Sequence, residues 1–246
     1  MPSLFIGCSG FTYPHWRGVF YPENIPQTRW FGYYCSVFSS LELNVTFYRL
    51  LKPETFESWN RHSPDNFTFC VKGSRYITHL KRLVSPEEPL KRFFEGVLCL
   101  GEKLRVVLWQ FPPGFARDTV RLECFLASLK TYPVRNALEF RNESWLTDKT
   151  ISLCREAGVA LCMADWPLFI TDLPVTSDFV YLRRHGHSGG YASRYSLEEL
   201  NSDASRIRKY LESGLDVQIY FNNDACGYAT ENARQLACLL EAESHL

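Results

Sequence analysis

Residues 105–112 have the sequence RVVLWQFP, in which four consecutive apolar residues precede Gln110. A short, continuously apolar run of this kind is typical of a strand buried on both faces of a parallel sheet. Seven similar β-rich runs recur along the chain, at residues 4–10 (LFIGCSG), 40–48 (SLELNVTFY), 67–74 (FTFCVKGS), 136–141 (NALEFR), 160–165 (ALCMAD), 179–186 (FVYLRRHG) and 216–223 (DVQIYFNN). Their spacing leaves room for a helix between successive runs, so the sequence predicts alternating strands and helices.

Several of the intervening segments carry helix start signals. Pro53-Glu54 opens PETFESWNRH, Ser85-Pro86-Glu87-Glu88 opens a second segment, and Ser196-Leu197-Glu198-Glu199 combines an N-cap residue with acidic residues in the first turn. Alternation leaves two architectures, an open doubly wound sheet or a closed barrel. Eight strands in 246 residues favour an α/β fold with a single (β/α)8 barrel of the TIM type, and we predict one domain over residues 1–246.

The composition is that of a folded chain with a large core: 46% of the residues are hydrophobic and 22% are charged. Twenty-seven basic and 27 acidic residues give a net charge of zero, so no global field draws the protein to nucleic acid or anionic membrane. No apolar run reaches the ~18 residues of a membrane-spanning helix. Nine cysteines, none in a C-x-x-C pair, are expected to be reduced core residues. We therefore expect a soluble, cytoplasmic protein with no membrane contact.

Polar residues stand at the end of every predicted strand, where barrels of this kind build their active sites. Alternation places Glu42, Asn44 and Thr46 on one face of the second strand, and Lys72 and Ser74 on one face of the third. The candidate catalytic residues are Glu42, Glu139, Asp165 and His185, and the candidate ligand-binding residues are Asn44, Lys72, Arg75, Tyr76, His79, Gln110, Arg141, Arg183, Asn222 and Asp224. Each could instead belong to a structural ion pair, but charges inside a barrel are costly, and so many together favour a pocket.

Two predicted loops combine aromatic and basic residues: residues 11–23 (FTYPHWRGVFYPE) and residues 75–83 (RYITHLKRL). Such a mixture suits stacking on a base or sugar while phosphates are neutralised. For Trp16 and Phe20 we favour the alternative, that their rings pack on the rim of the barrel.

The sequence does not identify a cofactor, and metal chemistry with a divalent ion is open but not favoured. His185 and His187 form an H-x-H pair, and Glu42, Glu139, Asp165 and Asp224 could hold a divalent Mg or Mn ion, but neither arrangement is favoured. GCSG is not the G-x-S-x-G elbow of hydrolases, so Ser9 is a weak candidate nucleophile.

The segments YPHWRGVFYPE, LELNVTFYRL, SRYITHLKRL, QFPPGF, EFRNESW, FVYLRRHG and YFNND resemble, in this order and over nearly the whole chain, the motifs of the YecE-like proteins, or domain of unknown function 72. The resemblance implies a TIM-type barrel in a soluble prokaryotic protein of unestablished activity, and its recurring polar positions fall on the candidates named above. The sequence departs from the pattern at Asn142-Glu143, where His-Pro is usual, and at Arg184, where an aliphatic residue is usual. The barrel is also distantly similar to the xylose isomerase and endonuclease IV group.

The leading functional hypothesis is an enzyme, a hydrolase, lyase or isomerase, that acts on a phosphorylated or polyhydroxylated ligand. Lys72, Arg141 and Arg183 would bind the anion, Glu139 or Glu42 would be the general base, and His185 the acid. Two alternatives stay open: a nucleic-acid-binding or processing protein, and a non-catalytic ligand sensor. The oligomeric state is not indicated.

Lys72 and Arg183 are the cations that we expect to hold the anion, because both end apolar strands at a partly desolvated mouth. Glu42 and Glu139 could neutralise them instead, in internal salt bridges that leave no anion site.

Overall fold

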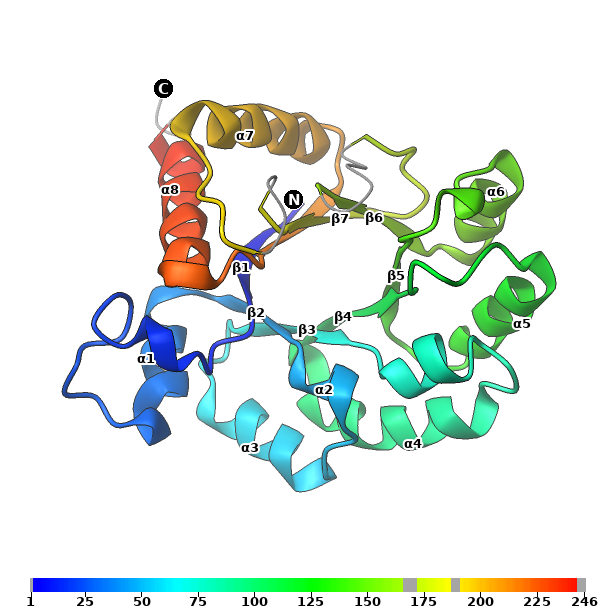
Figure 1. Ribbon diagram of the computed structural model, residues 1–246, viewed down its shortest axis with the longest axis horizontal. Helices are drawn as coiled ribbons and strands as arrows, with labels where there is room; N and C mark the ends of the chain where they lie inside the picture. Colours follow the sequence, from blue (N-terminus) through cyan, green and yellow to red (C-terminus); the bar gives the residue numbers. More distant parts are fainter. Residues whose placement is uncertain (1, 166–171, 187–190, 243–246) are drawn as a thin grey trace.

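The computed structural model describes residues 2–165, 172–186 and 191–242. Eight parallel strands form a closed barrel in the order of the sequence, drawn as the central ring of Figure 1. The strands are β1 (Leu4–Ser9), β2 (Ser40–Leu43), β3 (Thr68–Lys72), β4 (Leu104–Gln110), β5 (Arg135–Glu139), β6 (Ala160–Ala164), β7 (Phe179–Arg184) and β8 (Asp216–Phe221). The ring closes where β1 pairs with β8, with Leu4 opposite Val217 and Cys8 opposite Phe221. The predicted fold class is confirmed.

Helices surround the ring and cover the outer face of the sheet (Figure 1). They are α1 (Trp30–Val37), α2 (Val45–Tyr48), α3 (Pro53–His62), α4 (Glu87–Val97), α5 (Thr119–Leu129), α6 (Asp148–Ala157), α7 (Leu197–Glu212) and α8 (Tyr228–Ala242), with short 3-10 turns η1 (Pro14–Trp16), η2 (Gln27–Arg29), η4 (Leu98–Lys103), η5 (Glu143–Trp145) and η6 (Ala225–Gly227), and a π-helical turn η3 (Tyr76–Leu80). Residues 172–178, the described part of the β6–β7 connection, form no helix.

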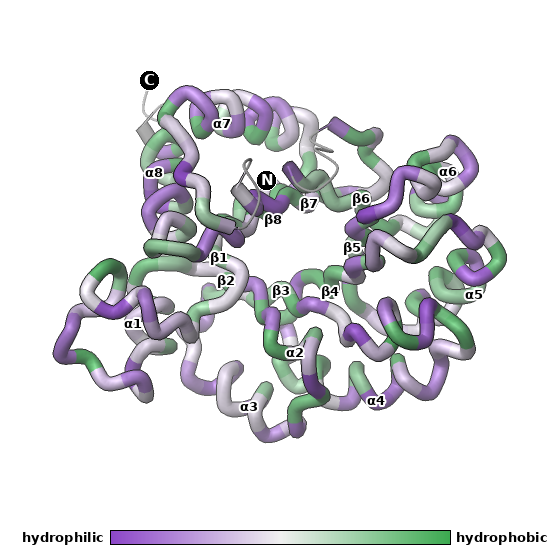
Figure 2. The backbone as a smooth tube through the Cα atoms, in the orientation of Figure 1, coloured by the Kyte–Doolittle hydropathy of each residue, from purple (hydrophilic) through white to green (hydrophobic). Residues whose placement is uncertain are grey.

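The barrel wall separates two cores. The larger one lies between the sheet and the helices, and the smaller one, which includes Cys70, Leu108, Cys162, Tyr181 and Tyr220, fills the interior of the barrel. The helices bury one stripe each, so hydrophobic and hydrophilic residues alternate along the turns of α5 and α8 in Figure 2. The strands have both faces covered, which explains why they are almost continuously apolar in sequence.

The predicted helix starts are confirmed at α3, which begins at Pro53, and at α7, where Ser196 and Glu199 form a capping box. At α4 the cap is Pro86 rather than Ser85, and the helix begins at Glu87.

The predicted second strand is too long. It ends at Leu43, and Val45–Tyr48 form a single helical turn, α2. The hydroxyl of Thr46 donates to the backbone oxygens of Lys72 and Leu43, at 2.6 and 3.1 Å, which fixes this turn against the end of β3. Asn44 and Thr46 therefore do not continue the inward face of β2, because tertiary contacts override the β-propensity of these residues.

The nine cysteines are free thiols, but they are not all core residues. Cys8, Cys70, Cys154 and Cys162 are buried, whereas Cys124, Cys226 and Cys238 are exposed. Cys124 lies on α5 and Cys238 on α8, where one face of each helix meets solvent, so the apolar neighbourhood in sequence did not imply burial. In the described parts of the chain, the helices are too short or too polar to cross a membrane.

Candidate functional site

A buried ionic cluster lies inside the barrel at the C-terminal ends of the strands. Arg183 on β7 donates from Nη2 to Oε1 of Glu42, at 2.8 Å, and from Nη1 to Oε2 of Glu139, at 2.6 Å. All three side chains are essentially inaccessible, with 0% of the Arg183 side chain exposed. The cluster joins β2, β5 and β7, so these predicted residues converge at one end of the barrel.

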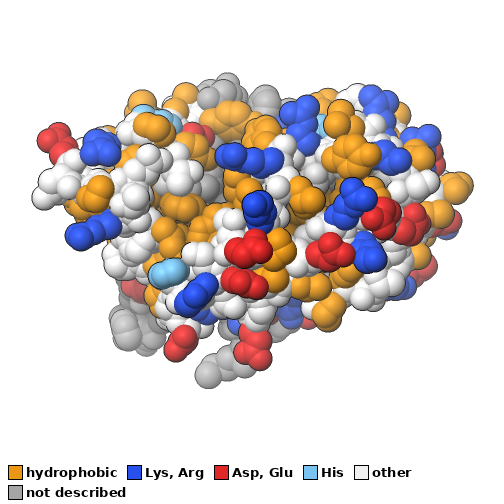
Figure 3. All heavy atoms as spheres, turned by 90° about the horizontal axis from the view of Figure 1, so that it is seen from below, with side chains coloured by type: hydrophobic (Ala, Val, Ile, Leu, Met, Phe, Trp, Pro, Cys, Tyr) orange, Lys and Arg blue, Asp and Glu red, His pale blue; other side chains and the backbone are white. Residues whose placement is uncertain are grey.

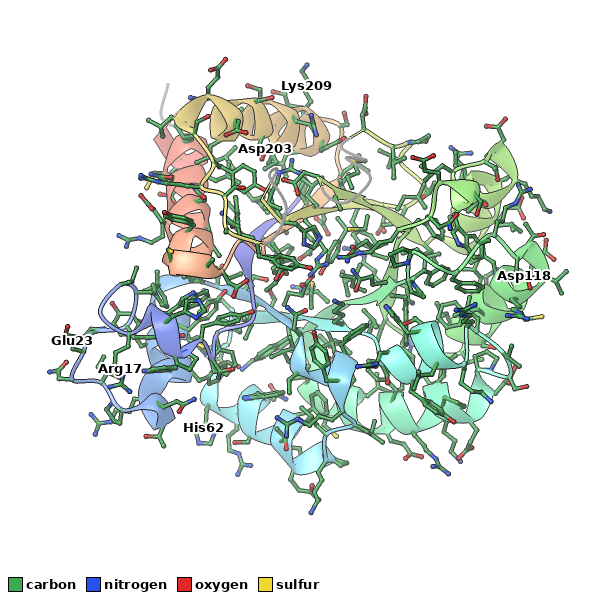
Figure 4. The ribbon with its side chains drawn as sticks, in the orientation of Figure 1. Arg17, Glu23, His62, Asp118, Asp203 and Lys209 are labelled. Atoms are coloured by element: carbon green, nitrogen blue, oxygen red, sulfur yellow. The ribbon has the colours of Figure 1, made fainter. Side chains whose placement is uncertain are left out.

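Arg183 therefore forms internal salt bridges and is not exposed to bind an anion. Both of its terminal nitrogens are occupied by carboxylates, and burial leaves an added ligand no access to them. The β7 side chain one position later, Arg184, points the opposite way and forms a buried salt bridge with Asp203 of α7. Figure 4 shows Asp203 on the side of α7 that faces the sheet, and Lys209 on the opposite side. The unusual arginine at this position is explained by that partner.

Glu42 receives two further hydrogen bonds. The Ser9 hydroxyl donates to its Oε1 and the Tyr181 hydroxyl donates to its Oε2, each at 2.6 Å. Burial alone would raise the pKa of Glu42, but the positive charge of Arg183 and these two hydrogen bonds outweigh burial and hold the pKa below its usual range. Glu42 is therefore an ionised, fully satisfied carboxylate, which makes it a weak proton acceptor.

Glu139 also accepts hydrogen bonds on Oε1, the oxygen that Arg183 does not bind. Gln110 Nε2 and Arg141 Nε both donate to its Oε1, at 2.8 Å, and His185 Nε2 lies 3.7 Å from the same oxygen. Burial opposes ionisation, but Arg183 and Arg141 dominate and hold the pKa of Glu139 well below its usual range. The negative charge of Glu139 is therefore paired with basic neighbours inside the barrel.

His185 is buried and oriented by its neighbours. Asn222 Nδ2 lies 3.0 Å from His185 Nδ1, and Arg183 Nη1 lies 3.3 Å from Nε2, the ring nitrogen nearest Glu139. Burial, and after it the charge of Arg183, lowers the pKa of His185. Asp165 does not touch the ring: its carboxylate accepts from the backbone N–H of His185, at 2.8 Å, and from the Tyr195 hydroxyl. Asp165 therefore fixes the end of β7 rather than facing a ligand.

Lys72 is the exception among the charged strand-end residues. Its Nζ lies 4.2 Å from the centre of the Phe47 ring, and the residue is only 8% exposed. Within residues 2–165, 172–186 and 191–242 the side-chain nitrogen of Lys72 forms no hydrogen bond or ion pair. Burial, and after it the charge of Arg183, lowers the pKa of Lys72 to about 7, although Glu139 and Glu42 act in the opposite direction.

Besides burial, the balance of the neighbouring charges explains why the protonated form of Lys72 is disfavoured. Glu42 and Glu139 carry two negative charges, and Arg183 and Arg141, which bind them, carry two positive charges. A proton on Lys72 is therefore an uncompensated positive charge in a partly desolvated position. Gly73 follows directly, and a Cβ there would lie 2.1 Å from Cε3 of Trp109, so the chain can leave β3 in this way only at a glycine.

Arg75 and Arg141 lie near Lys72, and together the three side chains form a positively charged rim close to His79. His79, on η3, packs edge-on against Phe47 with the ring centres 4.9 Å apart, and its Nδ1 is 2.8 Å from the Thr78 hydroxyl. Burial, and after it the charges of Lys72, Arg141 and Arg75, lowers the pKa of His79 to about 4. These cations are thus close enough to act on one imidazole. Tyr76 and Arg75 are exposed, on the outer side of this rim.

Asn44 follows β2 and Asp224 follows β8, the two strands that flank β1. Asn44 Nδ2 donates to the backbone oxygen of Ser9 at 3.1 Å, and its buried Oδ1 has no hydrogen-bond partner among the described residues. Burial raises the pKa of Asp224, whose Oδ2 is 3.8 Å from Nε2 of His15. Burial thus raises the pKa of Asp224 and lowers that of Lys72, and in both cases it disfavours the charged form.

The aromatic loop after β1 is a packing element, as expected for two of its rings. Trp16 and Phe20 are buried, and Trp16 Nε1 donates to the backbone oxygen of Asp224 at 2.9 Å. In the parts of the chain that are described, no three His, Cys, Asp or Glu side chains are grouped so that they could hold a metal ion. His187, of the H-x-H pair, lies outside the described residues.

Sequence reasoning missed two side chains of the site. Tyr181, which bonds Glu42, lies two residues before Arg183 on β7, so the period of two could have placed it on the same inward face. Phe47, under Lys72, belongs to the helical turn that was predicted as strand, and no local signal reveals it.

The closed barrel and its charged strand ends define a TIM-type barrel with an ionic cluster at the end where such proteins place their sites. The chain belongs to the DUF72 family, described as a protein of unknown function, whose sequence profile matches residues 5–246.

Relatives and solved structures agree with this assignment. The chain is 27% identical to the UPF0759 protein YunF of Bacillus subtilis, over 91% of this chain and 90% of that one, and 28% identical to the UPF0759 protein YecE of Escherichia coli, over 51% and 44%. A DUF72 family protein from Thermotoga maritima has a TM-score of 0.86 at 30% identity, covering 97% of this chain and 99% of that one. A D-psicose 3-epimerase structure, with a TM-score of 0.55 at 8% identity over 90% and 93% of the chains, shares the fold alone.

Proposed function

We propose that this protein is an enzyme that carries out acid–base chemistry on a phosphorylated or polyhydroxylated small molecule bound at the C-terminal ends of the strands. The observation that carries the proposal is Lys72: an ammonium group at the mouth of the barrel that no described residue neutralises, beside an ionic cluster whose charges already balance. An anionic group of a ligand supplies the missing counter-charge.

The residues divide into two roles. Lys72, with Arg141 and His79 close by, contacts the anionic part of the ligand. Glu42, Glu139 and Arg183 are positioning residues, because their charges are paired with one another and hold Arg141 and His185 in place. Proton transfer falls to Lys72, since a group that titrates near neutral pH can both accept and donate a proton.

This assignment moves the general base away from Glu42 and Glu139. Ionised carboxylates that accept several charge-assisted hydrogen bonds are weak bases, and both are shielded from a ligand by burial. His185, buried beside Arg183 and Glu139, is suited to hydrogen bonding within the cluster. The chemistry that fits is movement of a proton next to an anionic group, as in isomerases, lyases and some hydrolases.

Ligand binding is tested by thermal unfolding with inorganic phosphate and with ribose 5-phosphate. We expect both to raise the Tm of the wild-type protein and of Lys130→Met, whose exposed lysine follows α5 and serves as the matched control. Lys72→Met should lose the shift. An equal shift in Lys72→Met would contradict the assignment of Lys72.

Catalysis is tested separately by incubating the protein with ribose 5-phosphate in D2O and following the sugar protons by NMR. An enzyme of this class exchanges a carbon-bound proton with solvent or converts the sugar, and Lys72→Met should abolish either change. Binding that depends on Lys72, with no exchange or conversion across a panel of sugar phosphates, would favour the ligand sensor instead.

A further inference from the structure

A groove on the outside of the barrel lies next to the positively charged rim. It runs between the end of α2, the π-helical turn η3 and α4, and encloses about 710 Å³. Its walls include Tyr48, Arg49, Leu50, Arg75, Tyr76 and Lys81. We call it the η3 groove. Figure 3 views the molecule from the side that carries α3 and α4, and shows hydrophobic and basic side chains lying next to each other on this face.

The apolar side chains of the η3 groove are unusually exposed. Tyr48 is 68% exposed and Tyr76 is 50% exposed, and Leu50 and Leu80 are also open to solvent. Single exposed apolar residues are normal on a protein surface, but four in one groove mark a surface that contacts something else.

The charges of the groove are strongly biased. Arg92 is paired with Glu88, at 3.0 Å, which leaves Arg49, Arg75 and Lys81 as basic side chains that form no ion pair with another described residue. The whole chain has a net charge of zero, so this excess of positive charge is local. Charge complementarity therefore indicates an anionic occupant.

The backbone that forms one wall of the groove is also unusual. Tyr76–Leu80 form a π-helical turn, and Arg82, Leu83 and Ser85 have φ values of +46°, +65° and +45°, which side-chain-bearing residues rarely adopt. Leu83 is buried and its N–H donates to the backbone oxygen of Ile77 at 3.1 Å, so packing holds this conformation. Local strain of this kind is concentrated at functional segments.

We propose that the η3 groove binds single-stranded nucleic acid, with bases stacked on Tyr48 and Tyr76 and backbone phosphates held by Arg49, Arg75 and Lys81. Each tyrosine is adjacent in sequence to an arginine, in the pairs Tyr48-Arg49 and Arg75-Tyr76. An exposed ring can stack on a base while the neighbouring guanidinium group binds a backbone phosphate. The two ring–cation pairs therefore match the alternation of bases and phosphates along a strand. An acidic, leucine-rich peptide would satisfy the charge of the groove but not the pairing of rings with guanidinium groups.

The groove and the mouth of the barrel meet at Arg75. Its side chain lines the groove, and its charge acts on His79 at the rim. A strand in the groove therefore leads toward the barrel mouth. The proposal stands without the proposed enzymatic function, because the groove residues do not include Lys72 or the buried cluster.

The test is fluorescence anisotropy with a labelled oligothymidylate of about 12 nucleotides, within the usual range of site sizes. We expect saturable binding by the wild-type protein at about 50 mM salt, with an affinity that falls steeply toward about 200 mM. Arg49→Ala combined with Arg75→Ala should weaken binding at least roughly tenfold and reduce the dependence on salt, because two phosphate contacts are lost.

The tyrosines separate stacking from other contacts. Tyr48→Leu combined with Tyr76→Leu should weaken binding roughly 25-fold or more, whereas the two Tyr→Phe changes should retain it, because stacking requires the ring and not the hydroxyl. Arg155→Ala, at an exposed arginine in the last turn of α6, is the matched control and should bind like wild type. Lys72→Met should also bind, which separates this proposal from the enzymatic one.

Three results would overturn the proposal. They are the absence of saturable binding at low salt, wild-type affinity in both the arginine and the tyrosine double variants, and tighter, competing binding of an acidic leucine-rich peptide of the same length. Since all the substituted side chains except that of Lys72 are exposed or line the groove, thermal unfolding should show that the variants remain folded. A duplex of the same sequence should bind more weakly, because its bases are not free to stack.

Discussion

Arg183 and Lys72 are basic residues at the same end of the same barrel, yet their surroundings differ. Arg183 is fully buried between Glu42 and Glu139, and each carboxylate has further donors, so the charges are compensated where they stand. Lys72 sits a short distance away over the Phe47 ring, with no carboxylate bound to it among the described residues.

A charged residue at a strand end is therefore not by itself a ligand contact. Arg suits the buried position because its fork bonds two carboxylates at once and it keeps its proton. Lys suits the mouth because its pKa responds to burial and to neighbouring charge, so its protonation can follow the arrival of a ligand. In the proposed function, the buried cluster shapes the site and Lys72 responds to the bound ligand.

The largest expected effect comes from removing the shared cation. Arg183→Met leaves Glu42 and Glu139 ionised and facing each other in a buried position, and should lower the free energy of unfolding by about 3–5 kcal/mol. Chemical denaturation at neutral pH measures it. Stability close to that of the wild type would show that Arg183 is not the structural partner described above.

A smaller loss is expected when one donor to the cluster is removed. Tyr181→Phe takes away the hydroxyl that donates to Oε2 of Glu42 and should cost about 1–3 kcal/mol, the usual effect of leaving a buried polar atom without its partner. Tyr210→Phe is the matched control, because the one contact of that hydroxyl among the described residues is a 3.5 Å contact with Sδ of Met163. Equal effects of the two substitutions would argue against a special role for Tyr181.

The smallest effect, and of opposite sign, is expected at Lys72. Lys72→Met removes a poorly compensated charge and should leave the protein as stable as the wild type or up to about 2 kcal/mol more stable below pH 7. Since burial lowers the pKa of Lys72 to about 7, the unfolded chain binds a proton that the folded chain does not between that pH and the usual pKa near 10.5.

This difference in proton binding sets the direction in which stability changes with pH. The stability of the wild type relative to Lys72→Met should rise as the pH is raised above about 7. Parallel stability curves for the two proteins from about pH 6 to about pH 9 would mean that Lys72 titrates normally. Lys130→Met, tested in the same way, should run parallel to the wild type because its side chain is exposed.

Comparison with the sequence shows where local patterns carry information. Buried parallel strands have a distinctive apolar pattern, and their C-terminal ends meet by topology, so Glu42, Glu139 and Arg183 could be predicted to converge. Which cation pairs with which carboxylate could not, because Arg183 and Glu42 are 141 residues apart and the pairing depends on the shape of the barrel interior.

Two further features depended on packing. The turn at Val45–Tyr48 has the β-branched and aromatic residues of a strand, but Thr46 and Phe47 of this turn contact β3 and η3 in a helical conformation. The exposed arrangement of Tyr48 and Tyr76 in one groove follows from that turn and from η3, neither of which has a signal in the sequence.

NMR titration of the Lys72 side-chain nitrogen in lysine-labelled protein tests whether Lys72, and not Arg183, is the cation available to a ligand. The signal is assigned by its loss in Lys72→Met. We predict a midpoint at a pH of about 7 without ligand, and a higher midpoint when inorganic phosphate is added, because a bound anion stabilises the protonated form. A midpoint near the usual value of 10.5, unchanged by phosphate, would contradict the account.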